Sequence, residues 1–153
     1  MDLGRNLKVE SVSRLHPTPP WQVAPTQTVA AAVQLMRERN VGCVLICQEE
    51  RLIGIFTERD LLRRVLAPNL PLTTPIFECM TPSPVVVHPK DSIGSAIKRM
   101  EEGGYRHLPV VVDERPVGIL SAKRVVHYLV EHFAATVFNL PPAAAPPPKR
   151  EGA

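Results

Sequence analysis

The chain repeats itself at a constant offset of 64 residues. The matched segments are Val23-Ala24-Pro25 with Val87-His88-Pro89, Met36 with Met100, Glu50-Arg51 with Glu114-Arg115, and Gly54-Ile55 with Gly118-Ile119. A repeat of this length is one supersecondary unit used twice, so the sequence predicts a fold of two like halves. Each half alone, at roughly 60 residues, would bury too little surface to be stable, and we expect the halves to pack together.

Each copy predicts the same order of elements, β-α-β-β-α. Apolar residues at helical spacing follow Thr28 and Ser92, which are residue types that favour the start of a helix. Two apolar runs of strand length, joined by a short charged turn, predict a hairpin in each copy. The expected elements are strand 21–23, helix 29–39, strands 43–47 and 52–56 and helix 58–66, then strand 85–87, helix 93–102, strands 108–112 and 116–120 and a helix from 122 to 133.

The 153 residues suit one compact domain or two small halves with a shared core, of mixed α/β (α+β) class. We divide the chain into a polar lead-in (1–11), a first unit (12–70), a second unit (76–135) and a tail (140–153). The tail is rich in Pro and Ala, has nothing to bury and is expected to be flexible or polyproline-like.

Composition excludes several classes of function. Lys and Arg number 18 against 15 Asp and Glu, and a net charge of +3 is too small to indicate nucleic acid binding. No apolar stretch approaches the ~20 residues needed to span a bilayer, and no secretory signal is visible. Three cysteines in apolar surroundings fit a reducing compartment, so we expect a cytoplasmic protein. The five histidines show no zinc-ligand spacing, and no catalytic constellation can be defended.

Four segments carry a family resemblance. They are Leu52–Asp60, Cys79–Val85, Tyr105–Val111 and Val117–Ser121. In this order the chain resembles a cystathionine-β-synthase-type (CBS) repeat used twice, an arrangement called a Bateman module. The resemblance covers Val12 to Phe133, and Gly54–Asp60 matches the G-h-h-T-x-x-D signature of the family.

The resemblance implies a non-catalytic regulatory module. Its two repeats would pack through their sheets with pseudo-two-fold symmetry and two clefts. Family members commonly hold AMP, ADP, ATP or S-adenosylmethionine in such clefts, so it implies a reversible adenosine-containing ligand, no tightly bound cofactor and a regulated partner protein. It also implies a homodimer, which would cover the apolar residues that follow Thr57 and Ser121: Leu61, Leu62, Val65, Val125, Val126 and Leu129.

Thr57 and Asp60 have two interpretations. Spaced three residues apart at a helix start, they form a capping box, in which each side chain bonds the other residue's backbone N–H. The family resemblance instead assigns the Asp60 carboxylate to the ribose hydroxyls of the ligand and Thr57 to phosphate. We favour the ribose role, because a carboxylate can accept hydrogen bonds from both hydroxyls of a vicinal diol.

The counterpart helix start carries two cations. Ser121 is the expected cap, and Lys123 and Arg124 fill the first turn, where the helix dipole disfavours cations by roughly 0.3–1 kcal/mol each. A bound anion would offset this cost. Alternatively, the long side chains extend into water at little cost, and the sequence leaves both interpretations open.

The resemblance extends to three further positions. In related regulatory subunits of energy-sensing kinases, bases at the positions of Arg106 and Lys123 reach the phosphate of a nucleotide whose ribose lies on the other repeat, whereas Arg at the position of Arg124 marks an unproductive cleft. Gly42 departs from a frequent base, which further favours one adenosine site. Trp21 either belongs to the core or flanks the adenine ring, and we place it at the cleft edge.

Other classes of function remain as alternatives. The chain could be a ligand-independent interaction or dimerisation module, with Thr57 and Asp60 serving only as caps. It could also associate with nucleic acid through Arg106, Lys123 and Arg124, although nucleic acid is the less expected partner.

Overall fold

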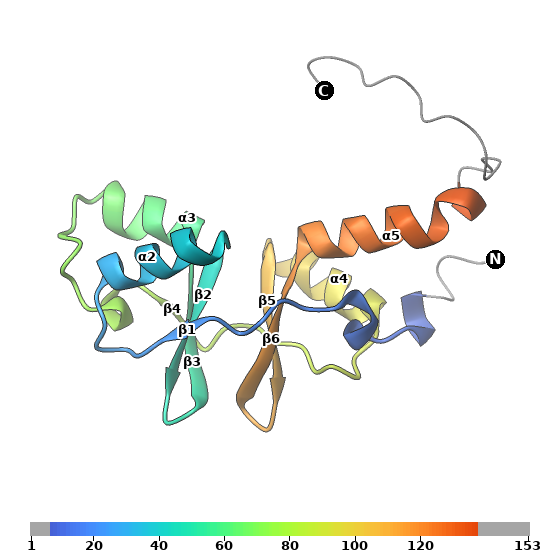
Figure 1. Cartoon of the computed structure of the whole chain (residues 1–153), viewed down its shortest axis with the longest axis horizontal. Helices are drawn as coiled ribbons and strands as arrows, with labels where there is room; N and C mark the ends of the chain where they lie inside the picture. The colour runs from blue at the N-terminus through green and yellow to red at the C-terminus, as the bar shows by residue number, and fades with distance from the viewer. Residues whose placement is uncertain (1–6, 138–153) are drawn as a thin grey trace, which may run out of the picture.

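The computed structural model describes residues 7–137, with side chains described up to residue 132. The predicted tail and most of the predicted lead-in lie outside this range. The elements are η1 (Val12–Leu15), β1 (Gln22–Val23), α2 (Val29–Arg39), β2 (Cys43–Gln48), β3 (Arg51–Thr57), α3 (Glu58–Asp60), η2 (Leu61–Leu66), η3 (Ile76–Glu78), β4 (Thr81–Pro82), α4 (Ile93–Gly103), β5 (His107–Val112), β6 (Arg115–Ser121) and α5 (Ala122–Val137). The mixed α/β class with two related halves is confirmed (Figure 1).

The helices begin where the sequence predicts because their caps are local. Thr28 accepts a hydrogen bond from the N–H of Ala31 at 3.1 Å, and Ser92 does the same for Ser95 at 3.0 Å. Asn40 and Gly104 end α2 and α4 in the left-handed conformation that closes a helix.

Two predicted elements differ in the structure. The helix expected over 58–66 is α-helical only to Asp60 and continues as the π-helix η2, in which the N–H of Ala67 bonds the carbonyl of Leu62 at 2.9 Å. The strand expected over 85–87 is wrong, because only Val87 pairs, in a single parallel bridge with Val110. The lead of the second unit instead forms β4 at Thr81–Pro82.

The two sheets follow one plan. In the first, the order is β1-β2-β3-β4, with β1 parallel to β2 and the other pairs antiparallel. In the second, β5 and β6 repeat the hairpin with its bulge 64 residues later, and isolated bridges at Val87 and Thr18 stand where the first sheet has β1 and β4.

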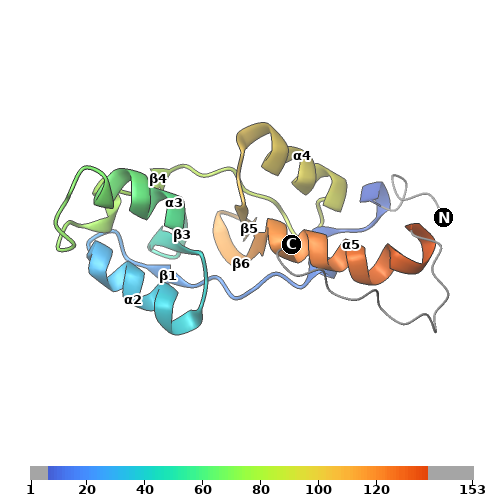
Figure 2. The same cartoon turned by 90° about the horizontal axis from the view of Figure 1, so that it is seen from above.

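The segments that begin each repeat are exchanged between the halves. Val12 and Leu15 of η1 are buried in the core of the second half, and Ile76 and Cys79 are buried in the core of the first. Figures 1 and 2 show the consequence: the chain crosses between the halves twice, before β1 and again after β4, along opposite sides of the molecule.

The halves also meet through their hairpins. Cys43, Leu45, Cys47 and Ile55 of the first half pack with Ile119 of the second in a separate buried cluster. Burial raises the pKa of the Cys43 thiol to about 12 and that of Cys47 to about 11, so both thiols are neutral and serve as small apolar residues.

The tips of the two hairpins are joined by ion pairs and have residues with positive φ angles. Arg51 pairs with Glu114 at 3.3 Å, and Arg115 pairs with Glu50 at 3.2 Å, in a reciprocal arrangement between the halves. Both turns place two non-glycine residues at positive φ: Glu49 (51°), Glu50 (68°), Asp113 (50°) and Glu114 (67°). Such two-residue turns favour Asn and Gly, so glutamate here is strained.

We predict that Glu49→Asn stabilises the fold. The Glu49 side chain makes no hydrogen bond or ion pair within the described residues, and Asn tolerates the left-handed conformation better. The free energy of unfolding in urea should rise by up to about 1 kcal/mol. Glu101→Asn, at an exposed position of α4, is the matched control and should lower stability slightly because Asn is the poorer helix former. A loss of stability in both variants would contradict strain at the turn.

Candidate functional site

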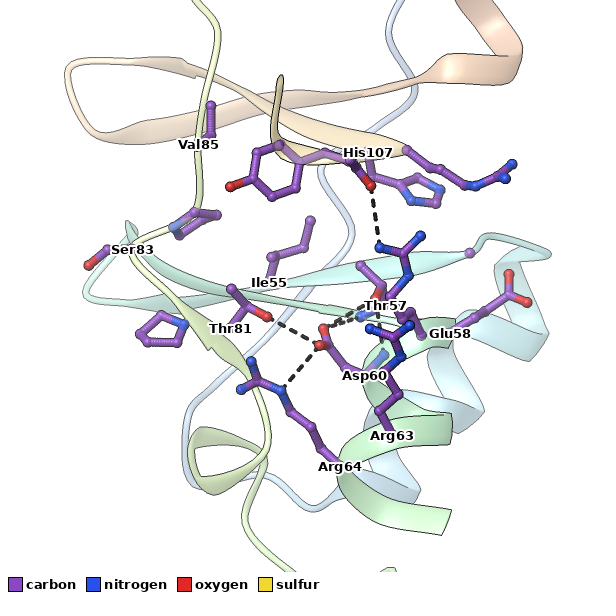
Figure 3. A pocket seen from close by; sticks show the side chains of 18 residues that line it. Ile55, Thr57, Glu58, Asp60, Arg63, Arg64, Thr81, Ser83, Val85 and His107 are labelled. Carbon is purple, nitrogen blue, oxygen red and sulfur yellow. Dashed lines mark hydrogen bonds and ion pairs between the residues drawn. The ribbon is translucent and has the colours of Figure 1, made fainter. Parts of the chain in front are cut away.

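A cavity of about 630 Å³ lies between the halves (Figure 3). Three segments line most of it: residues 57–64 at the start of α3 and η2 in the first half, residues 81–85 around β4, and residues 103–107 leading into β5. The exchange of lead segments brings these together, because β4 belongs to the second repeat but pairs with β3 of the first sheet.

The helix start after β3 is closed by a capping box. Thr57 donates its backbone N–H to Oδ2 of Asp60 at 3.0 Å, and Thr57 Oγ1 accepts from the N–H of Asp60 at 3.2 Å. The capping box predicted for Thr57 and Asp60 is therefore present. The ribose role of Asp60 stays a prediction.

The Asp60 carboxylate has partners beyond its own turn. Oδ2 also accepts from the hydroxyl of Thr57 at 3.2 Å. Oδ1 accepts from the hydroxyl of Thr81 at 3.2 Å and lies 3.4 Å from Nε of Arg64, whose Nη1 donates to the carbonyl of Met80 at 2.8 Å. Figure 3 shows Thr57, Thr81 and Arg64 converging on this carboxylate, which is 8% exposed. Asp60 thus joins the first half to the lead segment of the second.

The cavity is basic. Four arginines line it, Arg59, Arg63, Arg64 and Arg106, against the carboxylates of Glu58 and Asp60. Arg59 donates to the carbonyl of Gly104 across the halves at 3.3 Å. Within the described residues, the guanidinium groups of Arg63 and Arg106 make no hydrogen bond or ion pair. These two cations are available to an anionic ligand.

Glu58 and His107 approach each other near Gly42. A Cβ on Gly42 would lie 2.7 Å from Oε1 of Glu58 and 3.1 Å from Nε2 of His107, so a side chain here would displace one of them. Burial lowers the pKa of His107 below its ordinary value; Arg106 acts in the same direction, and Glu58 opposes both. His107 is therefore neutral at neutral pH.

The structure separates the predicted site residues into two groups. Thr57, Asp60 and Arg106 line the cavity together, whereas Trp21, Ser121, Lys123 and Arg124 do not. Ser121 and Arg124 occupy the positions 64 residues after Thr57 and Asp60, and Ser121 Oγ accepts from the N–H of Arg124 at 3.1 Å. They and Lys123 start α5, the helix of the other half, and do not share the wall that contains Asp60.

Trp21 lies at the start of the first unit, where it packs against the first core. The guanidinium of Arg39 stands 4.1 Å from the centroid of its ring, a cation–π contact. The binding roles of Trp21, Ser121, Lys123 and Arg124, like those of the residues in the cavity, stay predictions.

Sequence reasoning missed several lining residues. Arg64 follows Asp60 by four residues, a spacing at which opposite charges pair on a helix, so this neighbour could have been found. Thr81 and His107 come from the other half, and no local pattern in the sequence indicates that they approach Asp60.

Among the described residues, no group of three or more His, Cys, Asp or Glu side chains is placed to hold a metal ion. No helix in this part of the chain is long and apolar enough to cross a membrane.

The CBS domain family matches residues 12–67 and 76–131. Hypoxic response protein 1 of Mycobacterium tuberculosis is 36% identical over 112 residues, which are 72% of this chain and 78% of that protein.

Solved structures agree with this match. A conserved protein of Pyrococcus horikoshii has a TM-score of 0.73 and 25% identity over 84% of this chain and 94% of that chain. Hypoxic Response Protein I, solved with two coordinated zinc ions, has a TM-score of 0.70 and 30% identity over 78% of this chain and 99% of that chain. A CBS domain pair in complex with 5′-methylthioadenosine and S-adenosyl-L-methionine has a TM-score of 0.73 at 24% identity, a likeness of fold alone.

We predict that protonation of His107 destabilises the fold. Because the folded pKa is lowered, the unfolded chain binds the proton more tightly, and stability is lost as the pH falls through and below about 6.5. The urea midpoint should fall between pH 7.5 and pH 5.5, and this fall should be smaller in His107→Gln than in the parent. His127→Gln is the control for the substitution: the exposed His127 ring pairs with Glu131 at 3.0 Å, a contact that acid does not weaken at the imidazole, so this variant should not show the smaller fall. An identical slope in His107→Gln and the parent would contradict the prediction.

Proposed function

The chain belongs to the CBS-domain family as a tandem pair of repeats, and we propose that it is a non-catalytic regulatory module that binds an adenine nucleotide in the cavity between its halves. CBS-domain proteins are generally regulatory. The observation that carries the proposal is that Asp60 lines one cavity with Arg63 and Arg106, two arginines from different halves that have no hydrogen bond or ion pair among the described residues. A cavity of about 630 Å³ is of the size that small-molecule sites have.

The charges favour a phosphate-bearing ligand. Four arginines outnumber the two carboxylates in the lining, so the cavity attracts anions. AMP, ADP and ATP carry such charge, whereas S-adenosylmethionine carries a sulfonium cation and fits less well. In the proposed complex Asp60 accepts from the ribose hydroxyls, and Arg63 and Arg106 donate to phosphate.

Binding would be transmitted by linkage. A ligand that contacts both halves favours the arrangement in which they are held together, and any partner that distinguishes this arrangement responds to ligand concentration. The partner regulated in this way is a second protein.

The first test is binding by the parent. AMP, ADP or ATP at ~100 times its Kd should raise the free energy of unfolding by about 2.7 kcal/mol if only the native state binds. Asp60→Ala should weaken AMP binding about 10- to 150-fold in calorimetry, because hydrogen bonds to a charged acceptor are lost. Asp91→Ala is the matched control: Asp91 also accepts a backbone N–H and pairs with an arginine, but lies outside the cavity. It should lose stability without losing affinity.

A ligand-independent interaction module is the second candidate. It is favoured by one observation, that Thr57, Thr81 and Arg64 already satisfy the Asp60 carboxylate. If Asp60→Ala loses thermal stability but binds AMP as the parent does, Asp60 is only a cap. If no adenosine ligand at millimolar concentration shifts the melting temperature of the parent, nucleotide binding is excluded and the interaction module stands.

We also propose that the chain forms a homodimer. Of the apolar residues predicted to need cover, Val65 and Val125 lie in the cores, whereas Leu62 and Val126 are 61% and 59% exposed. Leu66 and Val130 extend these exposed faces on η2 and α5. In Figure 1, the helix after β3 and α5 lie on the same side of the molecule, so one partner surface can cover both.

Light scattering of the parent at tens of micromolar should therefore give the mass of a dimer. The double variant Leu62→Glu with Val126→Glu should give a monomer, because it places charges in the proposed interface. Val117→Glu, at a valine of β6 that is also half-exposed, is the control and should stay dimeric. A monomeric parent would refute the proposal.

A further inference from the structure

Thr81 occupies an acceptor that the proposed ligand needs. Oδ2 of Asp60 is held inside its own turn by the N–H and the hydroxyl of Thr57. Oδ1 is held from outside the turn, by the hydroxyl of Thr81 at 3.2 Å and by Arg64 at 3.4 Å. Because the capping box fixes Oδ2, Oδ1 is the oxygen that can exchange partners. Thr81 itself lines the cavity, so a ligand in the cavity meets this hydroxyl.

We propose that Thr81 is an internal competitor for the ligand's ribose diol. In the free protein its hydroxyl donates to Asp60 Oδ1; in the complex a ribose hydroxyl takes that place and Thr81 is released. This inference rests on the proposed function, and it specifies how the site is regulated. The gain from the ribose hydrogen bonds to Asp60 is then reduced by the hydrogen bond that Thr81 gives up.

Arg64 is not the partner that exchanges. Its Nη1 donates to the carbonyl of Met80 at 2.8 Å, so the guanidinium is anchored on a second acceptor. Thr81 is held less firmly, because β4 has only two residues, and these pair with Gly54 and Ile55 at the edge of the first sheet. The hydroxyl of Thr81 can turn away by a side-chain rotation, whereas Arg64 would have to break two contacts.

A short connection joins Thr81 to the second half. Ser83, two residues on, has φ 46° and donates its N–H to the carbonyl of Ile53. Val87 then makes two hydrogen bonds with β5. Its N–H donates to the carbonyl of Pro109 at 2.9 Å, and its carbonyl accepts from the N–H of Val111 at 2.8 Å. The backbone after Thr81 therefore links the Asp60 site to the second sheet within six residues.

The test is Thr81→Val, which removes the hydroxyl and keeps the shape. Calorimetry should show AMP binding about 2- to 12-fold tighter than in the parent, because the ligand no longer displaces an internal hydrogen bond. The affinity for 2′,3′-dideoxy-AMP, which lacks the competing diol, should not change. Thr81→Ser should return AMP affinity to the parental value. Thr74→Val, which removes a hydroxyl that bonds Pro71 away from the cavity, is the matched control and should bind as the parent does.

The outcomes separate this inference from the proposed function. If the parent binds AMP and Thr81→Val binds it equally or more weakly, Thr81 is not a competitor and the inference fails while the proposed function stands. If Thr81→Val gains equally for AMP and the dideoxy analogue, valine only adds apolar contact, and the inference also fails. If the parent binds no AMP, ADP or ATP, the proposed function fails and the inference with it.

Discussion

Two buried residues from the segment that begins each repeat complete the core of the opposite half. Val12 and Leu15 do so for the second half, and Ile76 and Cys79 for the first. Burial of one such side chain is worth about 1.5–3 kcal/mol, and whole domains are stable by only about 5–15 kcal/mol. Neither half can therefore keep a full core without the other's lead segment. The exchange makes one folding unit of two repeats that would each be marginal.

The same exchange creates the candidate site. Because β4 crosses to pair with β3, the lead of the second repeat becomes a wall of a cavity whose other wall is the helix start of the first. Arg64 reinforces this placement by bonding the carbonyl of Met80 while it pairs with Asp60. The cavity thus exists only when the two halves are assembled, and the positions of its lining residues depend on how the halves are joined.

Local features were predictable from the sequence and long-range ones were not. The caps at Thr28 and Ser92 depend on bonds within three residues, and the hairpins depend on adjacent apolar runs, so pattern alone located them. The π-helix after Asp60 and the pairing of Thr81 with Ile55 depend on packing between distant segments. For the site, the family resemblance identified Thr57, Asp60 and Arg106, which all line the cavity. It gave no indication of Thr81 or His107, which reach the cavity through the pairing of β4 with β3 and the packing of the second half.

The two repeats share a helix N-cap after the hairpin but differ in the residue that faces it. In both copies a hydroxyl at the end of the hairpin accepts a hydrogen bond from the backbone N–H three residues later. Thr57 Oγ1 accepts from Asp60, and Ser121 Oγ accepts from Arg124. Only Asp60 can return the bond, so only the first copy has a closed capping box. Its carboxylate serves stability and, under the proposed function, binding. A ligand hydroxyl that displaces an internal donor from Asp60 gains less than one that meets an acceptor bonded only to water. Such a site stays reversible, as a regulatory module requires.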